Sequence, residues 1–178
     1  MSIMLGIRYL IEGALPKAIY EFQQSVHLNP NSATAHYLLA VGQLQTEHFA
    51  EAERELQIAL EINPQYQRAK IQLMLYFIAQ EKYQPALELF TKLITSSTSL
   101  PQESYTQEIF LKMARTLQNK LPQARRPHEV YNSLGIVYYL MGHNEEAQDY
   151  WRQSLEINSN QPGVVDVLNR FTPENEYY

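Results

Sequence analysis

The chain has 178 residues, of which 45% are hydrophobic and 19% are charged, and this composition excludes an intrinsically disordered chain. A net charge of −5 argues against nucleic acid as a partner, because binding to a phosphate backbone needs an excess of Lys and Arg. The absence of cysteine excludes disulfides, thiolate metal sites and a cysteine nucleophile.

The opening stretch, residues 2–15, is apolar but is not interpreted as a signal sequence. It has no basic start, and Arg8 and Glu12 interrupt it, so it is predicted to be a helix of the mature domain. No other stretch approaches the roughly 18 uninterrupted apolar residues that a transmembrane segment requires. By elimination alone, we expect a cytoplasmic protein.

A period of 34 residues runs without gaps through residues 1–100. Four sets of residues recur at this spacing. They are Gly6, Ala40 and Met74; Ala18, Ala52 and Ala86; the bulky residues Phe22, Leu56 and Phe90; and the prolines Pro30 and Pro64. A fourth copy follows 61 residues after the third, with Leu134, Gly135, Tyr138, Ala147 and Trp151. Small residues at fixed slots predict two antiparallel helices in close approach, with the bulky residues filling the gap beside them.

Each copy is predicted to be a helical hairpin. In the second copy, residues 33–46 and 49–62 both carry apolar residues at helical spacing and are separated by a two-residue turn. Asn29 and Asn63 precede prolines and are predicted to end the second helix of their copies, because a residue before Pro is forced out of the helical region. Asn158 is predicted to end the fourth copy in the same way.

These slots resemble the signature of the tetratricopeptide repeat, which combines a Leu-Gly pair, an aromatic residue, an Ala, a second aromatic and a closing Pro. The first copy carries them as Leu5, Gly6, Tyr9, Ala18, Phe22 and Pro30. The third copy keeps fewer of them, and Ser159 replaces the Pro in the fourth. The resemblance implies an all-α, right-handed solenoid of hairpins, with repeats at about residues 1–32, 33–66, 67–100 and 128–159.

Residues 101–127 break the period and are too few for another hairpin. An amphipathic helix from about Gln102 to Lys120 is predicted there, because apolar residues recur every four positions. These residues are Tyr105, Ile109, Met113 and Leu117. A short helix at about residues 162–171, opened by Pro162, is predicted to cap the C-terminal end of the repeats.

The inserted segment is rich in cations and carries no acid between Glu108 and Glu129. Its basic residues, which we call the basic patch, are Lys112, Arg115, Lys120, Arg125 and Arg126. They fit either a docking patch for an acidic protein, lipid headgroups or a phosphate backbone, or an ordinary solvated helix face.

The tetratricopeptide resemblance also implies that the first helix of each copy lines a concave groove. The predicted groove residues are Ile7, Tyr37, Leu38, Val41, Leu44, Ile71, Leu75, Ile78, Ile136 and Tyr139. A branch of the family grips chaperone tails with Lys, Arg and Asn at such slots, but here Arg68 is the only cation near them. An apolar groove instead suits an amphipathic helix or hydrophobic segment of a partner protein. The inserted helix, or a second copy of the chain in a homodimer, would fill it equally well.

Residue patterns for catalysis are missing from the sequence. The five histidines are scattered without the spacing of a zinc helix, and no phosphate-binding or nucleophile-elbow motif occurs. We therefore expect no enzyme activity, no metal and no cofactor. The predicted function is a protein–protein interaction scaffold or adaptor, a class that includes assembly factors. The alternative is an anionic-surface binder acting through residues 112–126.

Overall fold

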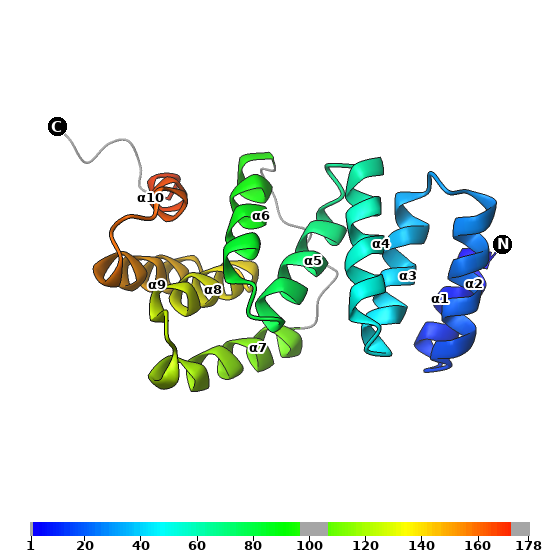
Figure 1. Ribbon diagram of the computed structural model, residues 1–178, viewed down its shortest axis with the longest axis horizontal. Helices are drawn as coiled ribbons and strands as arrows, with labels where there is room; N and C mark the ends of the chain where they lie inside the picture. The colour runs from blue at the N-terminus through cyan, green and yellow to red at the C-terminus, as the bar shows by residue number, and fades with distance from the viewer. Residues whose placement is uncertain (1, 97–106, 172–178) are drawn as a thin grey trace. The chain divides into compact units, whose positions relative to one another are not determined.

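The computed structural model describes residues 2–96 and 107–171 (Figure 1). Within these residues every regular element is helical, which confirms the predicted all-α class. The elements are α1 (Ser2–Ile11), α2 (Leu15–Leu28), α3 (Ala33–Gln45), α4 (Phe49–Ile62), α5 (Gln67–Ala79), α6 (Tyr83–Ser96), α7 (Gln107–Lys120), the 3-10 helix η1 (Leu121–Gln123), α8 (Pro127–Leu140), α9 (Asn144–Ile157) and α10 (Pro162–Asn169).

The helices form two compact units, Met1–Leu73 and Met74–Tyr178. In the first unit α1 packs against α2 and α3 against α4, and α2 lies against α3, so two hairpins are stacked. In the second unit α8 and α9 form a hairpin, α6 and α7 both pack on α8, and α10 contacts α6 and α9. The helical hairpins predicted from the repeat are therefore present in each unit.

In the first unit, the core forms where a glycine of α1 faces a ring of α2. Ala18, Phe22 and Leu39 make up a buried cluster that partly buried apolar side chains of α1, α2 and α3 surround. A Cβ atom on Gly6 would lie 2.5 Å from Cε1 of Phe22, which is closer than such atoms approach. The glycine therefore permits the close approach of α1 and α2 that the repeat predicted.

The second unit repeats this contact between Gly135 of α8 and Trp151 of α9. A Cβ atom on Gly135 would lie 2.2 Å from Nε1 of the indole, and Trp151 is fully buried. Its ring is 5.5 Å from that of Phe90 and stacks on Phe171 at 5.8 Å. Nε1 donates a hydrogen bond of 3.2 Å to the backbone carbonyl of Asn132, so the buried polar atom of the ring is satisfied.

Asparagine ends the second helix of three copies, as predicted. Asn29, Asn63 and Asn158 lie at the C-terminal ends of α2, α4 and α9 with non-helical backbone angles. Each side-chain oxygen accepts a hydrogen bond from the backbone N–H two residues later, at 3.3, 3.0 and 3.1 Å respectively. This local bond offers the backbone an alternative to a further helical turn, so the helix stops there.

The turn inside each hairpin places one residue in the left-handed region of backbone space. In the first and fourth copies this residue is Gly13 or Gly142, with φ of 74° and 83°. The second and third copies have Glu47 and Glu81 at the equivalent slot, with φ of 61° and 58°. A side chain held in this region costs roughly 1–2 kcal/mol, so these two glutamates carry backbone strain that glycine avoids.

The inserted helix α7 exists, but the face that it buries differs from the predicted one. Phe110, Ala114 and Leu117 are its buried residues, whereas Ile109 is 49% exposed. Residues spaced by four drift about 40° around a helix at each step, so a row of every fourth residue does not stay on one face. The packing against α8 follows an i, i+4, i+7 row instead. The predicted start of this helix, including Tyr105, lies outside the described residues.

The capping helix is confirmed as α10. It begins at Pro162 and buries Val164 and Val167 completely against its neighbours in the second unit. Pro is favoured in the first turn of a helix because its missing N–H would have no partner there. Arg170, just after the helix, donates a hydrogen bond to the backbone carbonyl of Ile94 on α6.

A buried polar contact joins the second hairpin of the first unit. His36 on α3 has one ring nitrogen, Nδ1, 2.6 Å from Oε2 of Glu55 on α4. The other, Nε2, lies 2.9 Å from the carbonyl oxygen of Pro30. Both side chains are largely buried, so removal of either partner leaves a polar group without compensation for its lost hydration.

Substitution of Glu55 by Ala is expected to lower the free energy of unfolding by about 1–3 kcal/mol, because His36 would keep its burial and lose its carboxylate partner. Urea denaturation followed by circular dichroism measures this change. Glu61 to Ala is the matched control, since Glu61 is exposed on the same helix. Equal effects of the two substitutions would contradict a structural role for the His36–Glu55 contact.

Substitution of Gly135 by Ala is expected to destabilise the second unit by about 1–3 kcal/mol, since the new methyl group would push Trp151 away from the carbonyl of Asn132. Gly163 to Ala is the control, because its Cβ would meet Thr91 at an ordinary 3.7 Å. Thermal unfolding should show a lower midpoint for the first variant and an unchanged or higher one for the control. The reverse order would contradict the packing argument.

Candidate binding surfaces

The predicted groove residues divide by exposure into two groups. Those that keep part of their surface in contact with solvent are Ile7, Tyr37, Leu38, Val41, Leu44 and Tyr139. Those that are buried are Ile71, Leu75, Ile78 and Ile136, at 2%, 4%, 2% and 0% exposure. Only the first group has surface to offer to a partner, because a buried side chain is already in contact with its own chain.

Helix α5 accounts for most of the buried group. Its residues from Leu73 to Ile78 are all buried, and so is Ile71, two residues before them. These apolar residues of α5 are therefore core residues, whereas Arg68 near the start of the same helix is exposed. The slot pattern of the repeat did not distinguish these buried residues of α5 from groove residues at the surface.

The half-buried groove residues of the first unit lie on α1 and α3. Ile7 and Leu38 pack on the same buried cluster around Phe22, so the structure brings these two predicted residues together. The ring of Tyr37 makes an edge contact with Tyr66 at 5.3 Å. Val41 and Leu44 follow at helical spacing on α3 and are also half-buried. We call Ile7, Tyr37, Leu38, Val41 and Leu44 the apolar surface.

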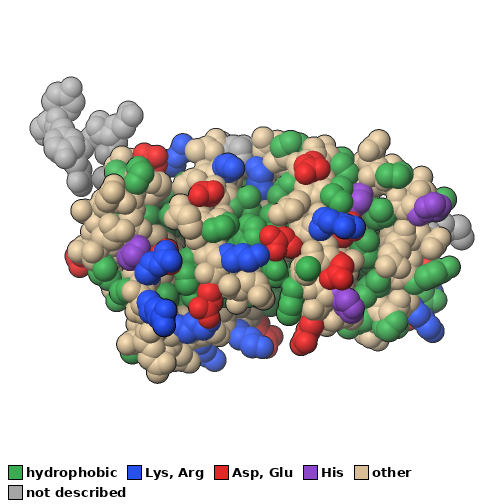
Figure 2. All heavy atoms as spheres, viewed as in Figure 1, with side chains coloured by type: hydrophobic (Ala, Val, Ile, Leu, Met, Phe, Trp, Pro, Cys, Tyr) green, Lys and Arg blue, Asp and Glu red, His purple; other side chains and the backbone are tan. Residues whose placement is uncertain are grey.

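The basic patch is divided by the fold into exposed and pocket-lining residues. Lys112 and Arg115 lie exposed on α7. The other three cations, Lys120, Arg125 and Arg126, line a pocket of about 710 Å³ in the second unit. Figure 2 shows Lys and Arg side chains gathered in the region of α7 and α8, with acidic side chains among them.

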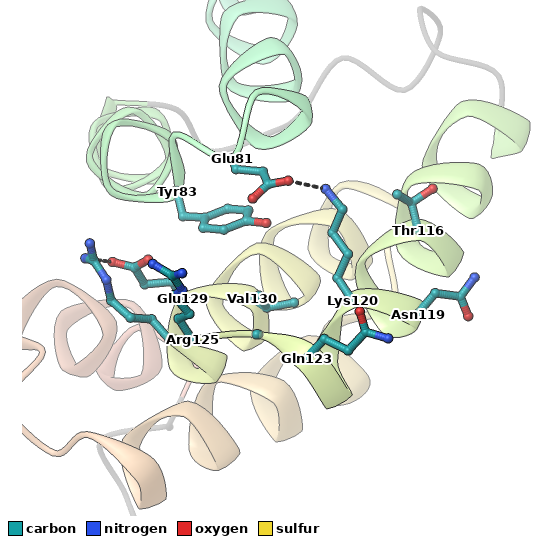
Figure 3. A pocket seen from close by; sticks show the side chains of 11 residues that line it. Glu81, Tyr83, Thr116, Asn119, Lys120, Gln123, Arg125, Glu129 and Val130 are labelled. Atoms are coloured by element: carbon teal, nitrogen blue, oxygen red, sulfur yellow. Dashed lines mark hydrogen bonds and ion pairs between the residues drawn. The ribbon is translucent and has the colours of Figure 1, made fainter.

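The pocket lies where the turn before α6 and the start of that helix meet the end of α7, η1 and the start of α8 (Figure 3). Figure 3 shows Glu81 and Tyr83 on one side of it and Lys120 and Asn119 on the other. The full lining is Glu81, Tyr83, Thr116, Asn119, Lys120, Gln123, Ala124, Arg125, Arg126, Glu129 and Val130. Apart from Ala124 and Val130, every one of these side chains carries a hydrogen-bonding or charged group.

Two ion pairs neutralise two of the three pocket cations. Nζ of Lys120 lies 2.6 Å from Oε1 of Glu81, and Nη1 of Arg126 lies 2.7 Å from Oε1 of Glu129. The hydrogen bond to Glu81 raises the pKa of Lys120, so the ammonium form is favoured. Arg125 is exposed and makes no ion pair with any residue in the described part of the chain.

Tyr83 adds a neutral hydroxyl to the wall of the pocket. Burial raises the pKa of its phenol, and the nearby carboxylate of Glu81 raises it further. The hydroxyl therefore keeps its proton near neutral pH and is available as a hydrogen-bond donor. Sequence reasoning missed both Tyr83 and Glu81, because they lie in the third copy and reach the inserted segment only through the fold.

One amide of α7 joins the end of this helix to both helices of the last hairpin. Nε2 of Gln118 donates hydrogen bonds to the hydroxyl groups of Tyr138 and Tyr150, at 3.2 and 3.1 Å. The two tyrosine rings are 5.0 Å apart and come from α8 and α9. These hydrogen bonds add to the apolar packing of α7 on α8, two residues before Lys120.

Neither a metal site nor a membrane-spanning helix is found in the described residues. No group of three or more His, Cys, Asp or Glu side chains is placed to hold a metal ion in this part of the chain. None of its helices combines the length and the apolar character that crossing a membrane would need.

The stacked helical hairpins place the chain in the class of helical repeat proteins, and the apolar surface and the pocket are the surfaces that it offers for binding. A family model of the tetratricopeptide repeat matches residues 9–75, and a second model of the same repeat matches residues 128–161. The chain belongs to the tetratricopeptide repeat family, as the slots of its sequence predicted. The family is one of protein-interaction scaffolds.

The type IV pilus assembly protein PilF of Pseudomonas aeruginosa is 27% identical to the chain over 186 residues. The match covers 99% of the chain and 63% of PilF, so the chain spans less than two thirds of that relative. A solved structure of Pseudomonas aeruginosa PilF superposes with a TM-score of 0.53 at 24% identity, covering 96% of this chain and 67% of the other.

A domain from yeast is similar in fold. The TPR2B domain of Sti1, solved in a complex with pHsp70, superposes with a TM-score of 0.56 at 23% identity. The superposition covers 66% of this chain and 94% of that domain. At this level of identity the likeness establishes the tetratricopeptide fold.

Alkaline pH is expected to destabilise the second unit through its tyrosines. Burial raises the pKa of Tyr139, whose ring contacts Phe90 and Phe171, and burial also raises those of Tyr83 and Tyr138. A raised pKa in the folded state contributes stability below about pH 10, where the unfolded phenol titrates, and this contribution is lost as pH rises further. Unfolding free energies at about pH 8, 9.5 and 10.5 should fall less in Tyr139→Phe than in the parent. Equal losses would contradict the prediction.

Proposed function

We propose that the chain is a protein-interaction scaffold that holds an apolar or amphipathic segment of another protein on its apolar surface. The observation that supports this most directly is the half-burial of Tyr37, Leu38 and Val41 on one side of α3. Side chains in this state keep apolar area that a partner can remove from water, at about 25 cal/mol per Å². Their own packing holds them in place, which lowers the entropy cost of binding.

The chemistry of the apolar surface favours a hydrophobic ligand over a charged one. Its five residues include no Lys or Arg, and the hydroxyl of Tyr37 is its only polar side-chain group. An amphipathic helix would present residues at spacings of three and four to such a surface, and burial would supply most of the affinity. The complex of the yeast Sti1 domain with pHsp70 is an example in which the same fold binds another protein.

An assembly role is the finer proposal. PilF is a type IV pilus assembly protein, and its similarity to this chain covers 99% of the chain and 63% of PilF. A scaffold that holds an apolar segment can keep an unassembled subunit from aggregating until its final partner arrives, because exposed apolar patches drive association. We therefore place the chain among assembly factors of this kind, with a protein subunit as its ligand.

The alternative function is binding of an anionic surface through the basic patch. The structure places acidic side chains of Glu81 and Glu129 beside two of its cations. Lys112 and Arg115 remain exposed on α7 for such a surface. This alternative stays a prediction, and strong dependence of vesicle binding on salt concentration is its marker.

A photo-crosslinking amino acid at Val41 tests the main proposal in cells that express the chain. We expect a crosslink to one other protein, and we expect Leu44→Asp to remove it because a carboxylate on the apolar surface opposes burial of the ligand. Leu28 is the control site, since it is apolar, exposed at the C-terminal end of α2 and not part of the apolar surface. Circular dichroism must show that Leu44→Asp keeps its helices.

Three outcomes would contradict the proposal. Crosslinking from Leu28 equal to that from Val41 would mean that contact is non-specific. A crosslink from Val41 only to a second copy of the chain would mean that the surface is a homodimer interface. A crosslink from Val41 only to residues of the same chain would mean that the surface is occupied from within.

A further inference from the structure

The pocket between the turn before α6, α7, η1 and α8 has an unbalanced set of charges. Lys120 and Arg126 each face a carboxylate of the chain, at 2.6 and 2.7 Å. Arg125 is exposed at the same pocket and makes no ion pair with a residue in the described ranges. The pocket thus has one positive charge that its own acids do not neutralise, and it belongs to a guanidinium.

The groups around Arg125 suit a single carboxylate. A guanidinium presents parallel N–H donors that match the two oxygens of a carboxylate, which makes the pairing bidentate and directional. The neutral hydroxyl of Tyr83 and the side-chain amides of Asn119 and Gln123 line the same pocket and add uncharged donors. Val130 supplies an apolar wall for the methylene groups of the ligand.

The acids of the pocket exclude a dense polyanion. Glu81 and Glu129 both line it, so a phosphate backbone or a charged lipid surface would bring many negative charges close to two carboxylates. A polypeptide segment can place one carboxylate against Arg125 and keep neutral or basic residues beside Glu81. The alternation of charges around the pocket therefore selects a segment with separated acidic residues.

We propose that this pocket binds a segment of a partner protein through an Asp or Glu side chain of that segment. Arg125 is the main hydrogen-bond donor to the carboxylate, and Tyr83 is a second donor. The site lies on the inserted segment and its neighbours, outside the slots of the repeat. It goes beyond the scaffold function proposed above, because it uses other helices and polar recognition. A partner held at this site needs no contact with the apolar surface.

The glutamate of the third hairpin turn controls the strength of this site. Glu81 competes with the ligand, because its carboxylate already holds Lys120 at 2.6 Å. Loss of that carboxylate would leave a second cation free for the ligand. Removal of the Arg125 charge is therefore expected to weaken binding of the ligand, whereas removal of the Glu81 charge is expected to strengthen it. Residues with a purely structural role would not change binding in opposite directions.

The test uses the full chain and fluorescence anisotropy with labelled twelve-residue peptides. Each peptide carries one, two or three Glu residues separated by Gly and Ser, has an amidated C-terminus, and is matched by a version with Gln in place of Glu. We expect binding of the Glu peptides with a dissociation constant below about 1 mM and at least about tenfold weaker binding of the Gln versions. Absence of binding by every Glu peptide at about 1 mM would overturn the proposal.

Four variants separate the site from general charge effects. Arg125→Gln should weaken binding of the best Glu peptide about tenfold and Tyr83→Phe about threefold, whereas Glu81→Gln should strengthen it about threefold. Arg115→Gln is the matched control, because Arg115 is an equally basic, exposed residue of α7 outside the pocket lining. An equal loss from Arg115→Gln, or weaker binding by Glu81→Gln, would overturn the proposal.

Two further probes decide between classes of partner. Vesicles containing phosphatidylserine and a short DNA duplex are added at the same charge concentration as the peptides. Tighter binding of the vesicles or of the DNA than of the Glu peptides would overturn the peptide proposal and favour a polyanion. The same conclusion would follow if Arg125→Gln lost binding of the vesicles or DNA but kept binding of the peptides. Because the peptides and variants probe the second unit only, failure here leaves the crosslinking result at Val41 unaffected.

Discussion

Close approach of the two helices in the first and last hairpins depends on a glycine placed directly against a large ring. Gly6 faces Phe22 in the first unit, and Gly135 faces Trp151 in the second, with no room for a methyl group at either contact. Dense packing of this kind brings many weak dispersion contacts together, and a hairpin of two short helices has few other sources of stability. Each hairpin also buries its remaining apolar face against a neighbouring helix, so the hairpins of a unit stabilise one another.

This packing leaves the hairpin turns free to differ between copies. All four turns need one residue with positive φ, and two of them use glutamate where glycine would be unstrained. In the third copy the strained residue is Glu81, which holds Lys120 of the inserted helix. The turn of one hairpin therefore takes part in positioning a segment that is absent from the repeat. Glu47, in the second copy, shows that the strain alone does not create such a contact.

The two candidate surfaces differ in the physical basis of recognition. The apolar surface on α1 and α3 would gain affinity from burial, which depends on area and is tolerant of ligand sequence. The pocket beside α7 would gain it from directional hydrogen bonds and paired charges, which depend on the position of individual groups. In repeat proteins function lies in surfaces placed on a common fold, and the inserted segment is where this chain departs from its repeat.

The residue pattern alone determined the helical hairpins, their ends at Asn29, Asn63 and Asn158, and the presence of an inserted helix and a capping helix. Such features depend on neighbours within one period, so spacing along the chain is enough to reveal them. Only the tertiary structure decided the rest: the burial of the predicted groove residues of α5, the face of α7 that packs on α8, and the meeting of Glu81 and Tyr83 with the basic patch. These depend on contacts between segments tens of residues apart, and no local pattern specifies which charges or which sides of a helix will meet.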